Sequence, residues 1–466
     1  MFKWLARTNH VFSTPRKARE KLADLPGDNP LKAIEELSDW VEALSGLKLE
    51  AKADICRLFD EHAQPYRRKL GKDYLGADGF QQKRIAFACH RFADLMAKSY
   101  LSCVKAYRSG EKGSDEIRKD LPLLICRALH AFHNQYRWSH LHSGHTDPRL
   151  WENLYWLYAY AEKTGIAGDA VTLYPVGPAK TSILQEFMKT LVLASSSPDS
   201  LSQIEFDIAN RFVALFSAHF VLDSHASPEL TFNLDLSSGN PPARKPSTGN
   251  ETALRFFGPG KAHVLAKALL ESGTPEEITQ GGLYPEDASR KALKHLVTHW
   301  SENPVSRKSE RHRVRLNIAI ACKMDCSQTE IWTSENISDG GFDAVIDGNP
   351  DWEKVGQLFF GRMGNSWDLC IVRRLGCGEE KKWHAGVEIL SRAVRPVEIA
   401  KDNSAMGILL AHFDEKEANI VAEDRNFAPN SRYEIMLEEK RNALIPIERL
   451  GKGFDFTLWR CRLAPL

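Results

Sequence analysis

The sequence has no apolar run long enough to cross a bilayer, which takes about 20 residues. LPLLI at 121–125 is typical of its longest apolar runs. The N-terminal stretch MFKWLARTNHVFSTPRKAREK lacks an apolar core of secretory-signal length and turns basic quickly. The nine cysteines are scattered and odd in number and form no CxxC pair, which favours reduced thiols over a disulfide framework. We therefore expect a cytoplasmic protein without a membrane span.

Net charge is also nearly absent, because 62 basic residues face 61 acidic ones. No global field draws such a chain to nucleic acid or to a membrane surface, so any electrostatic site must come from a local cluster. We expect no DNA or RNA partner for the chain. The sequence also lacks a Walker loop and a GxGxxG fingerprint, and GPGK at 258–261 lacks the first glycine of a P-loop.

The length and composition are those of a soluble multidomain protein. The chain has 466 residues, 43% hydrophobic and 26% charged, which suggests two to four domains with ample core. We expect an α+β multidomain fold, in which a helical region precedes a small antiparallel β-barrel and an additional small β unit. The predicted domains are residues 1–223, 224–302, 303–400 and 401–466.

The first 223 residues carry helical patterns. Ser13-Thr14-Pro15 and Asp28-Asn29-Pro30 each place a capping residue before a proline at the first helical position. After the second cap, apolar residues recur at steps of three and four and mark one helix face. They are Leu31, Ile34, Leu37, Val41 and Leu44. Further helices are predicted near 51–63, 80–107, 115–137, 150–163, 180–194 and 201–220.

The sequence pattern of residues 224–302 differs from that of the helical region before it. Residues 237–251 are rich in Pro, Gly, Ser and Asn and predict an exposed loop. LTFNLDL before this loop and TALRFFG after it predict a short strand pair. Two more helices are expected at 261–273 and 285–300.

From about residue 313 the apolar period switches to two. RLNIAIACK, TEIWTSENI, GFDAVID, QLFFGRM, WDLCIVRRL and HAGVEIL are short runs separated by turn residues. Six strands in under 90 residues indicate a small antiparallel barrel. The same pattern of short strand-like runs continues in MGILLAHF, EANIVAED, SRYEIML, ALIPIERL and FDFTLWRCRL. These predict a second small β unit or an extension of the first.

A basic cluster precedes the predicted barrel. VSRKSERHRVR at 305–315 holds five basic residues and one acidic residue. Such a run alone is typical of a solvated linker. These are mostly arginines, however, and they stand at the entry to a barrel. The guanidinium group offers planar, paired donors suited to phosphate oxygens and to the acceptor edge of guanine.

NISDGGF at 336–342 lies between two predicted strands, 20 residues after Arg315. Taken alone, it predicts a hairpin turn in which Asn336 and Ser338 bond their own backbone. The same side chains can also read a base edge, since they supply donors and acceptors. Gly340 and Gly341 permit a positive φ and close approach of a ligand to the backbone.

RxxxR, followed after about 20 to 30 residues by [DN]xSxxG inside a small β-barrel, resembles the PilZ domain family. Residues 311–315 supply the first motif here, and residues 336–341 supply the second. LCIVRRL and HAGVEIL resemble the last strands of that family. The resemblance covers roughly residues 305–398 and implies a bacterial receptor for cyclic di-GMP.

The resemblance also implies the contacts. In that family the two arginines contact phosphate and guanine, while the Asn and Ser of the second motif hold a guanine edge. The implied ligand-binding residues are Arg311, Arg315, Asn336, Ser338, Gly340 and Gly341, with a weaker assignment for Arg307. Arg307 to Arg311 is itself an RxxxR. We prefer Arg311 and Arg315 because the strand begins directly after them. Glu310 stands where family members that bind a ligand pair often have another arginine, so one ligand and two both stay open.

Two further groups of residues are candidates for metal. Histidines are densest at His130, His133, His140, His142 and His145, but no HExxH or supporting carboxylate pattern accompanies them. Satisfied or exposed histidines at a helix end are the favoured interpretation. Cys322 and Cys326 share a face of a predicted strand and have no second pair, so we interpret them as ordinary thiols.

These observations predict a non-enzymatic second-messenger receptor without a metal or cofactor, whose ligand is cyclic di-GMP. We expect ligand binding at the barrel and its basic junction to alter how the helical region is presented to a protein partner. Three alternatives stay open. In the first, the barrel is a scaffold that acts through protein contacts without a ligand. In the second, the helical region is a metal-dependent enzyme that has its site at the histidine cluster and is regulated by the barrel. In the third, residues 305–315 bind nucleic acid.

Overall fold

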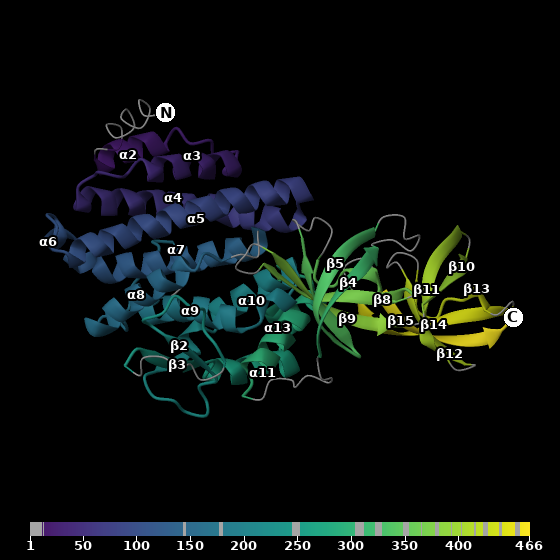
Figure 1. Cartoon of the computed structure of the whole chain (residues 1–466). Helices are drawn as coiled ribbons and strands as arrows, with labels where there is room; N and C mark the ends of the chain where they lie inside the picture. Colours follow the sequence, from purple (N-terminus) through teal and green to yellow (C-terminus); the bar gives the residue numbers. More distant parts are fainter. Residues whose placement is uncertain are drawn as a thin grey trace. The chain divides into compact units, whose positions relative to one another are not determined.

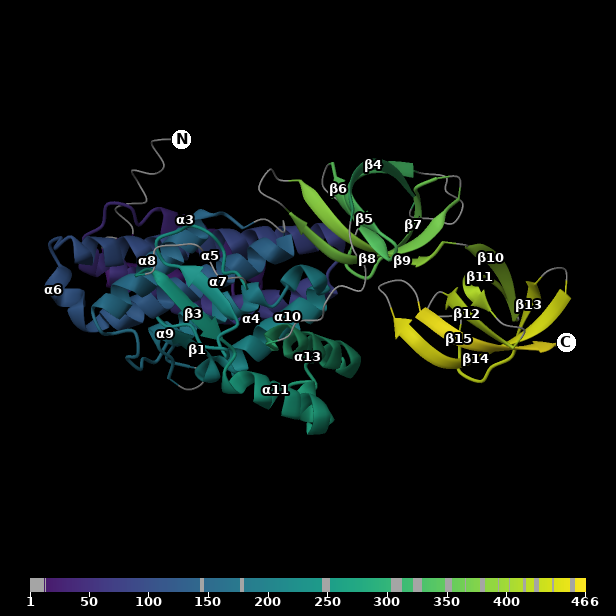
Figure 2. The same ribbon diagram turned by 60° about the horizontal axis from the view of Figure 1, so that its bottom comes forward.

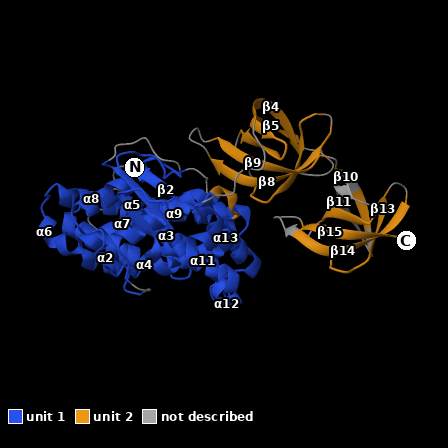
Figure 3. Ribbon diagram, turned by 90° about the horizontal axis from the view of Figure 1, so that it is seen from below, with its two compact units in different colours: residues 1–198, 203–304 blue, residues 199–202, 305–466 orange. Residues whose placement is uncertain are grey.

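The computed structural model describes most of the chain in ranges separated by short gaps. The described residues are 12, 14–142, 146–176, 180–244, 252–302, 312–321, 329–347, 354–364, 366–377, 382–392, 394–401, 403–413, 416–422, 427–437, 440–452 and 457–466. The chain divides into two compact units (Figure 3). Residues 1–198 and 203–304 form the helical unit, and residues 199–202 and 305–466 form the barrel unit.

The helical unit is a set of packed helices with one small sheet (Figure 1). Its longer helices are α2 (Pro15–Leu22), α3 (Pro30–Glu42), α4 (Leu49–Gly76), α5 (Gly79–Arg108), α7 (Leu121–His142), α8 (Arg149–Lys163), α9 (Ile183–Ser195), α10 (Gln203–Leu215), α11 (Lys261–Ser272) and α13 (Glu286–Trp300). Its short turns of helix are α6 (Ser114–Ile117), η1 (Arg118–Asp120), η3 (Ser217–His219) and α12 (Pro275–Ile278), and η2 (Pro198–Ser200) begins in this unit and continues into residues of the barrel unit.

Both predicted N-caps are present. The Thr14 side chain accepts a hydrogen bond from the Lys17 amide, and Asn29 accepts one from the Lys32 amide. The predicted apolar face of α3 is buried along its whole length. It lies against α4 and α5, and α5 in turn packs against α7, so these helices form successive layers (Figure 1).

The helix predicted at 51–63 is too short. α4 runs to Gly76 and contains Pro65 in its interior. A proline there removes one backbone hydrogen bond and usually ends or kinks a helix. α4 packs against both α3 and α5, and this tertiary packing outweighs the local preference.

The predicted strand pair is part of a three-stranded sheet in the helical unit. The strands are β1 (Val221–Asp223), β2 (Phe232–Asp235) and β3 (Leu254–Gly258), in the order β1-β3-β2. Residues 224–302 thus supply two strands of this sheet and the helices α11 to α13 of the same compact unit.

The barrel unit contains two closed six-stranded barrels (Figure 2). Barrel 1 has the order β4-β5-β6-β9-β8-β7 and barrel 2 the order β10-β11-β12-β15-β14-β13. The strands of barrel 1 are β4 (His312–Ala321), β5 (Thr329–Ser338), β6 (Gly341–Ile346), β7 (Leu358–Arg362), β8 (Asp368–Cys377) and β9 (Trp383–Ser391). Those of barrel 2 are β10 (Arg395–Lys401), β11 (Asn403–Phe413), β12 (Glu417–Ala422), β13 (Tyr433–Leu437), β14 (Lys440–Lys452) and β15 (Thr457–Pro465).

The predicted fold class is therefore confirmed: a helical region precedes a small antiparallel barrel and a further β unit. The sequence prediction missed β10, and with it the closure of the second barrel. β10 begins with Arg395-Pro396 and is only seven residues long, so its apolar pattern is short.

A hydrophobic cluster joins the two barrels within their unit. Leu358, Phe360 and Ile371 of barrel 1 pack in it with Val421 of β12, and Leu458 of β15 packs against it. Strands β7 and β8 are consequently buried on both faces over much of their length. This is why QLFFGRM and WDLCIV read as continuous apolar runs rather than as alternation.

Candidate functional site

The predicted ligand residues that the structure describes lie on β4, β5 and the hairpin that leads to β6. Arg313 on β4 pairs with Asn336 on β5, and Leu316 pairs with Ser334. Val314 and Arg315 therefore stand opposite the single residue Glu335, which makes a β-bulge at Arg315. Bulges re-aim side chains and are frequent at barrel rims and beside binding sites. Arg313 and Arg315 are both exposed, so their guanidinium groups are open to a ligand.

Asn336 is held between two neighbours in the sheet. It pairs with Arg313 on one side and with Asp343 of β6 on the other. Its Nδ2 donates a hydrogen bond to Asp343 Oδ2 at 3.1 Å. The side chain is only half-buried, so the amide has a fixed orientation and is accessible at the same time. A preoriented amide loses less conformational entropy when it binds a ligand.

Ser338 closes the hairpin. It pairs with Gly341 across the two-residue turn Asp339-Gly340, and its Oγ donates to the Gly341 carbonyl at 3.1 Å. The turn expected from NISDGGF is therefore present. Its hydroxyl proton is engaged locally, while the oxygen keeps acceptor capacity.

The two glycines do not use the left-handed backbone region that their presence permits, since neither has a positive φ. Gly341 is instead required by packing. A Cβ on Gly341 would clash with the Val387 carbonyl oxygen and would stand 3.1 Å from the Glu388 Cα. β6 and β9 thus approach each other too closely for any side chain at this position. The Gly340 carbonyl accepts a hydrogen bond from the Ile389 amide at 2.9 Å, which ties the turn to β9.

Two of the predicted arginines, Arg307 and Arg311, lie outside the described residues, as does Glu310. Arg315 is the member of the preferred RxxxR motif that the structure describes, and it lies beside Asn336 in the β4–β5 pair. Arg315 and the Asn-Ser motif, separated by 20 residues in the sequence, therefore lie on two paired strands.

Sequence reasoning missed the residues that support Asn336. Asp343 accepts from Asn336 through one oxygen, and its other oxygen lies 3.4 Å from Arg374 Nη2. Arg392 donates through Nη2 to the Asp339 carbonyl at 3.0 Å and so braces the turn. The alternation in GFDAVID places Asp343 on the outer face of β6, which marks it as accessible. Its pairing with Arg374 depends on the β6-β9-β8 strand order, which the sequence pattern does not specify.

The histidine-rich stretch does not assemble a metal site in the part that the structure describes. His130 Nδ1 lies 3.2 Å from Glu186 Oε2, and His140 stacks on Phe206. His133 is buried between Thr190 and Asn210, and burial lowers the pKa of His133 to about 3, which keeps the ring neutral.

Metal-ligand clusters are absent among the described residues, where no three His, Cys, Asp or Glu side chains could hold an ion. The side chain of His142 lies outside the described part of the structure, and so do the residues His145, Cys322 and Cys326. Over the same described ranges, none of the helices has both the length and the apolar content to cross a bilayer.

The fold and the site define a class of protein: a helical region followed by tandem six-stranded barrels, the first of which exposes arginine and amide groups at one strand pair. Residues 16–228 match the family model described as cyclic-di-GMP receptor FimW, N-terminal domain. The match covers a little under half of the chain and extends from α2 past β1. The match does not extend to the barrels. No curated protein and no solved structure matches the chain.

Proposed function

We propose that this protein is a non-enzymatic cyclic di-GMP receptor whose barrel 1 is a PilZ domain and binds the ligand beside the β4–β5 pair. The observation that carries the proposal is the β4–β5 register. It aligns Arg313 with Asn336 and leaves Arg315 in the adjacent bulge, so Arg315 is on the strand that pairs with the strand of Asn336 and Ser338. Independent support comes from the helical unit, which matches the N-terminal domain of a cyclic di-GMP receptor.

The chemistry of the ligand fits this surface. Cyclic di-GMP carries two phosphodiester charges and two guanine bases. A guanidinium group pairs with phosphate oxygens or with guanine O6 and N7. In the proposed complex Arg315 and Arg311 take these contacts, with Arg307 as a further candidate. Asn336 and Ser338 hold a guanine edge, and the Asp343–Arg374 pair keeps Asn336 oriented.

The proposed output is a change in how the helical unit meets a protein partner. The chain passes from α13 to β4 through the basic segment 303–311, which contains two of the proposed ligand arginines. Ligand contact with this segment biases the link between the two units and shifts the population that the partner binds. No catalytic step, cofactor or metal is part of this function.

Calorimetric titration of cyclic di-GMP into the full chain tests the proposal. The unmodified protein should bind with a Kd in the micromolar range or tighter. Arg315→Ala should weaken binding by about 2 kcal/mol or more, roughly thirty-fold, because a charge-assisted contact is lost. Arg441→Ala is the matched control, since Arg441 is an exposed strand arginine on barrel 2, and it should leave the Kd unchanged.

Three outcomes contradict the proposal. The absence of binding heat with the unmodified protein would favour a ligand-independent scaffold. Equal weakening by the Arg315 and Arg441 substitutions would point to a general charge effect. Strong, salt-dependent binding of DNA of any sequence would instead favour a nucleic-acid partner.

A further inference from the structure

A second candidate site lies in the helical unit, outside the barrels. A cavity of about 180 Å³ is lined by residues of α4, α7 and α10. One buried water needs roughly 10–15 Å³ of accessible space, while pockets for drug-sized ligands start near 300 Å³. The cavity therefore suits a small ligand. Apart from Gly71 and Trp138, its lining residues are polar or charged, so the ligand must be polar as well.

Four arginines dominate the lining of this cavity. Arg67 and Arg68 come from α4, Arg137 from α7 and Arg211 from α10, and Asp207 is the acidic residue among the lining side chains. Three helices that are distant in the sequence thus bring cations to one place. Arg68 and Arg211 are exposed and lie toward solvent, whereas Asp207 and Trp138 are buried.

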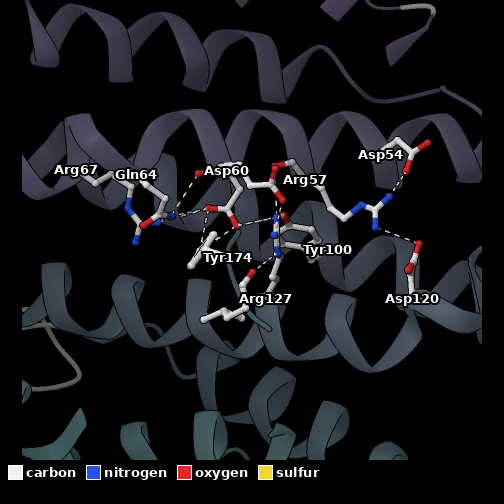
Figure 4. A network of polar contacts seen from close by, with 11 residues as sticks. Asp54, Arg57, Asp60, Gln64, Arg67, Tyr100, Asp120, Arg127 and Tyr174 are labelled. Atoms are coloured by element: carbon white, nitrogen blue, oxygen red, sulfur yellow. Dashed lines mark hydrogen bonds and ion pairs between the residues drawn. The ribbon is translucent and has the colours of Figure 1, made fainter. Parts of the chain in front are cut away.

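Arg67 is fixed by a buried polar network (Figure 4). Asp60, which is 3% exposed, accepts hydrogen bonds from the hydroxyls of Tyr100 and Tyr174, each at 3.1 Å. Arg67 Nη1 reaches the same carboxylate at 3.4 Å, and the Arg127 guanidinium stands 3.9 Å from it. Asp60 is thus shared among several donors. Within the described structure this is the one carboxylate that pairs with Arg67, so most of the Arg67 donors are left for another acceptor.

Arg137 is fixed in a comparable way. Its Nη2 donates to Asp207 Oδ1 at 2.5 Å, and its guanidinium lies 4.6 Å from the centre of the Trp138 ring. Asp207 also accepts from the Tyr284 hydroxyl. Arg137 Nε is buried and has no hydrogen-bond partner among the described atoms. A buried donor without an acceptor is unfavourable. The described structure therefore supplies the Arg137 guanidinium with fewer acceptors than it has donors.

The charge balance identifies the class of ligand. Asp60 and Asp207 offset two of the four arginines. The Nε of Arg211 is 3.8 Å from an Asp207 oxygen, and Asp207 already pairs with Arg137. Among the described residues, no ion pair joins Arg68 to a carboxylate. The surplus of two positive charges matches a phosphate group, which carries between one and two negative charges at neutral pH. Guanidinium forks also match phosphate oxygens in geometry.

We infer that the α4–α7–α10 cavity binds a small ligand that carries a phosphate group. Arg67 and Arg137 form preoriented contacts inside the cavity, and Arg68 and Arg211 close over the ligand from the exposed side. The free inorganic ion and the phosphate of a mononucleotide share this chemistry. This site is independent of the proposed barrel site and uses none of its residues.

The test is calorimetry of the full chain at low ionic strength with three probes: inorganic phosphate, guanosine monophosphate and acetate. The cavity variant is the double substitution Arg68→Gln and Arg211→Gln, both at exposed positions. The matched control is Lys69→Gln and Lys72→Gln, which removes two exposed charges from α4 at positions that do not line the cavity. Thermal unfolding of each variant verifies that the helical unit is folded.

We expect phosphate to bind the unmodified protein and the lysine control alike, and to bind the arginine variant at least about ten-fold more weakly. Acetate should bind weakly or not at all, because a monocarboxylate neutralises only one of the two surplus charges. Tighter binding of guanosine monophosphate than of phosphate would identify a nucleotide as the source, and the reverse would identify the free ion.

Equal loss of phosphate binding in the arginine variant and the lysine control would overturn the inference and indicate an adventitious ion only. The absence of phosphate binding to the unmodified protein would overturn it as well. Arg315→Ala separates this site from the barrel site. It should weaken cyclic di-GMP binding by roughly thirty-fold and leave phosphate binding unchanged, so the failure of one site can be distinguished from the failure of the other.

Discussion

The two barrels have the same strand order, so strands at equivalent positions can be compared. β4, β5 and β6 correspond to β10, β11 and β12, and both barrels close through antiparallel pairing of their first and fourth strands. Each core contains one buried tryptophan and one buried cysteine: Trp332 and Cys370 in barrel 1, Trp459 and Cys461 in barrel 2. The interiors are thus built on a similar plan.

The barrels differ where the second strand turns into the third. In barrel 1 this turn is Ser338-Asp339-Gly340-Gly341, and Gly341 lies against the β9 backbone. In barrel 2 the corresponding strands meet at Phe413 and Ala418, and the intervening sequence is Asp-Glu-Lys-Glu. No [DN]xSxxG motif stands there. A six-stranded barrel of this order therefore forms without the motif. In barrel 1 Gly341 is required by packing against β9, and the proposed ligand role concerns Asn336 and Ser338.

Substitution of Gly341 should give the largest difference between the barrels. Gly341→Val places a side chain against the Val387 carbonyl oxygen, and we expect a loss of about 3 kcal/mol or more in the stability of barrel 1. Alkylation of the buried thiols reports this loss. Burial raises the pKa of Cys370 and of Cys461 to about 12, so each reacts slowly until its barrel opens.

Peptide mass spectrometry after alkylation at pH 8 should find Cys370 labelled faster in the Gly341→Val variant, with less change at Cys461. Gly364→Val is the control, because a Cβ at Gly364 has no atom within 4 Å. Unchanged protection of Cys370 in the Gly341 variant would show that β6 and β9 separate without cost, contrary to the packing described above.

A smaller effect is expected from Asp343, which supports the proposed site without being one of its ligand contacts. Asp343→Ala removes the acceptor of the Asn336 amide and the partner of Arg374. Asn336 then loses its orientation, and we expect cyclic di-GMP affinity to fall by about 1 kcal/mol, or roughly five-fold. Calorimetry provides the measurement. Glu434→Ala, at an exposed acidic position on barrel 2, should have no effect; if both variants bind like the unmodified protein, Asp343 has no positioning role.

The sequence predicted those features that depend on local pattern. The N-caps at Thr14 and Asn29, the buried face of α3 and the NISDGGF turn all follow from residues close together in the chain. The features it missed depend on contacts between distant segments. α4 continues through Pro65 because α3 and α5 pack against it, and Asp343 meets Arg374 only because β6, β9 and β8 are neighbours.

The role of the glycines shows the same limit in a single residue. Gly341 was interpreted from the sequence as a source of backbone freedom, yet the structure requires it because β9 lies too close for a side chain. The cavity between α4, α7 and α10 was not foreseen either. Its arginines lie at ordinary helical positions up to 144 residues apart in the chain (Arg67 to Arg211), and only the packing of the helices brings them together.

The most direct test of the account is hydrogen exchange of the full chain with and without cyclic di-GMP. We predict slower amide exchange in residues 312–316 and 336–341 of barrel 1 when the ligand is present. Strands β10 and β12 of barrel 2, residues 395–401 and 417–422, should exchange at unchanged rates. Protection confined to barrel 2 or to residues 16–228, or no protection at all, would contradict the claim that the ligand binds beside the β4–β5 pair.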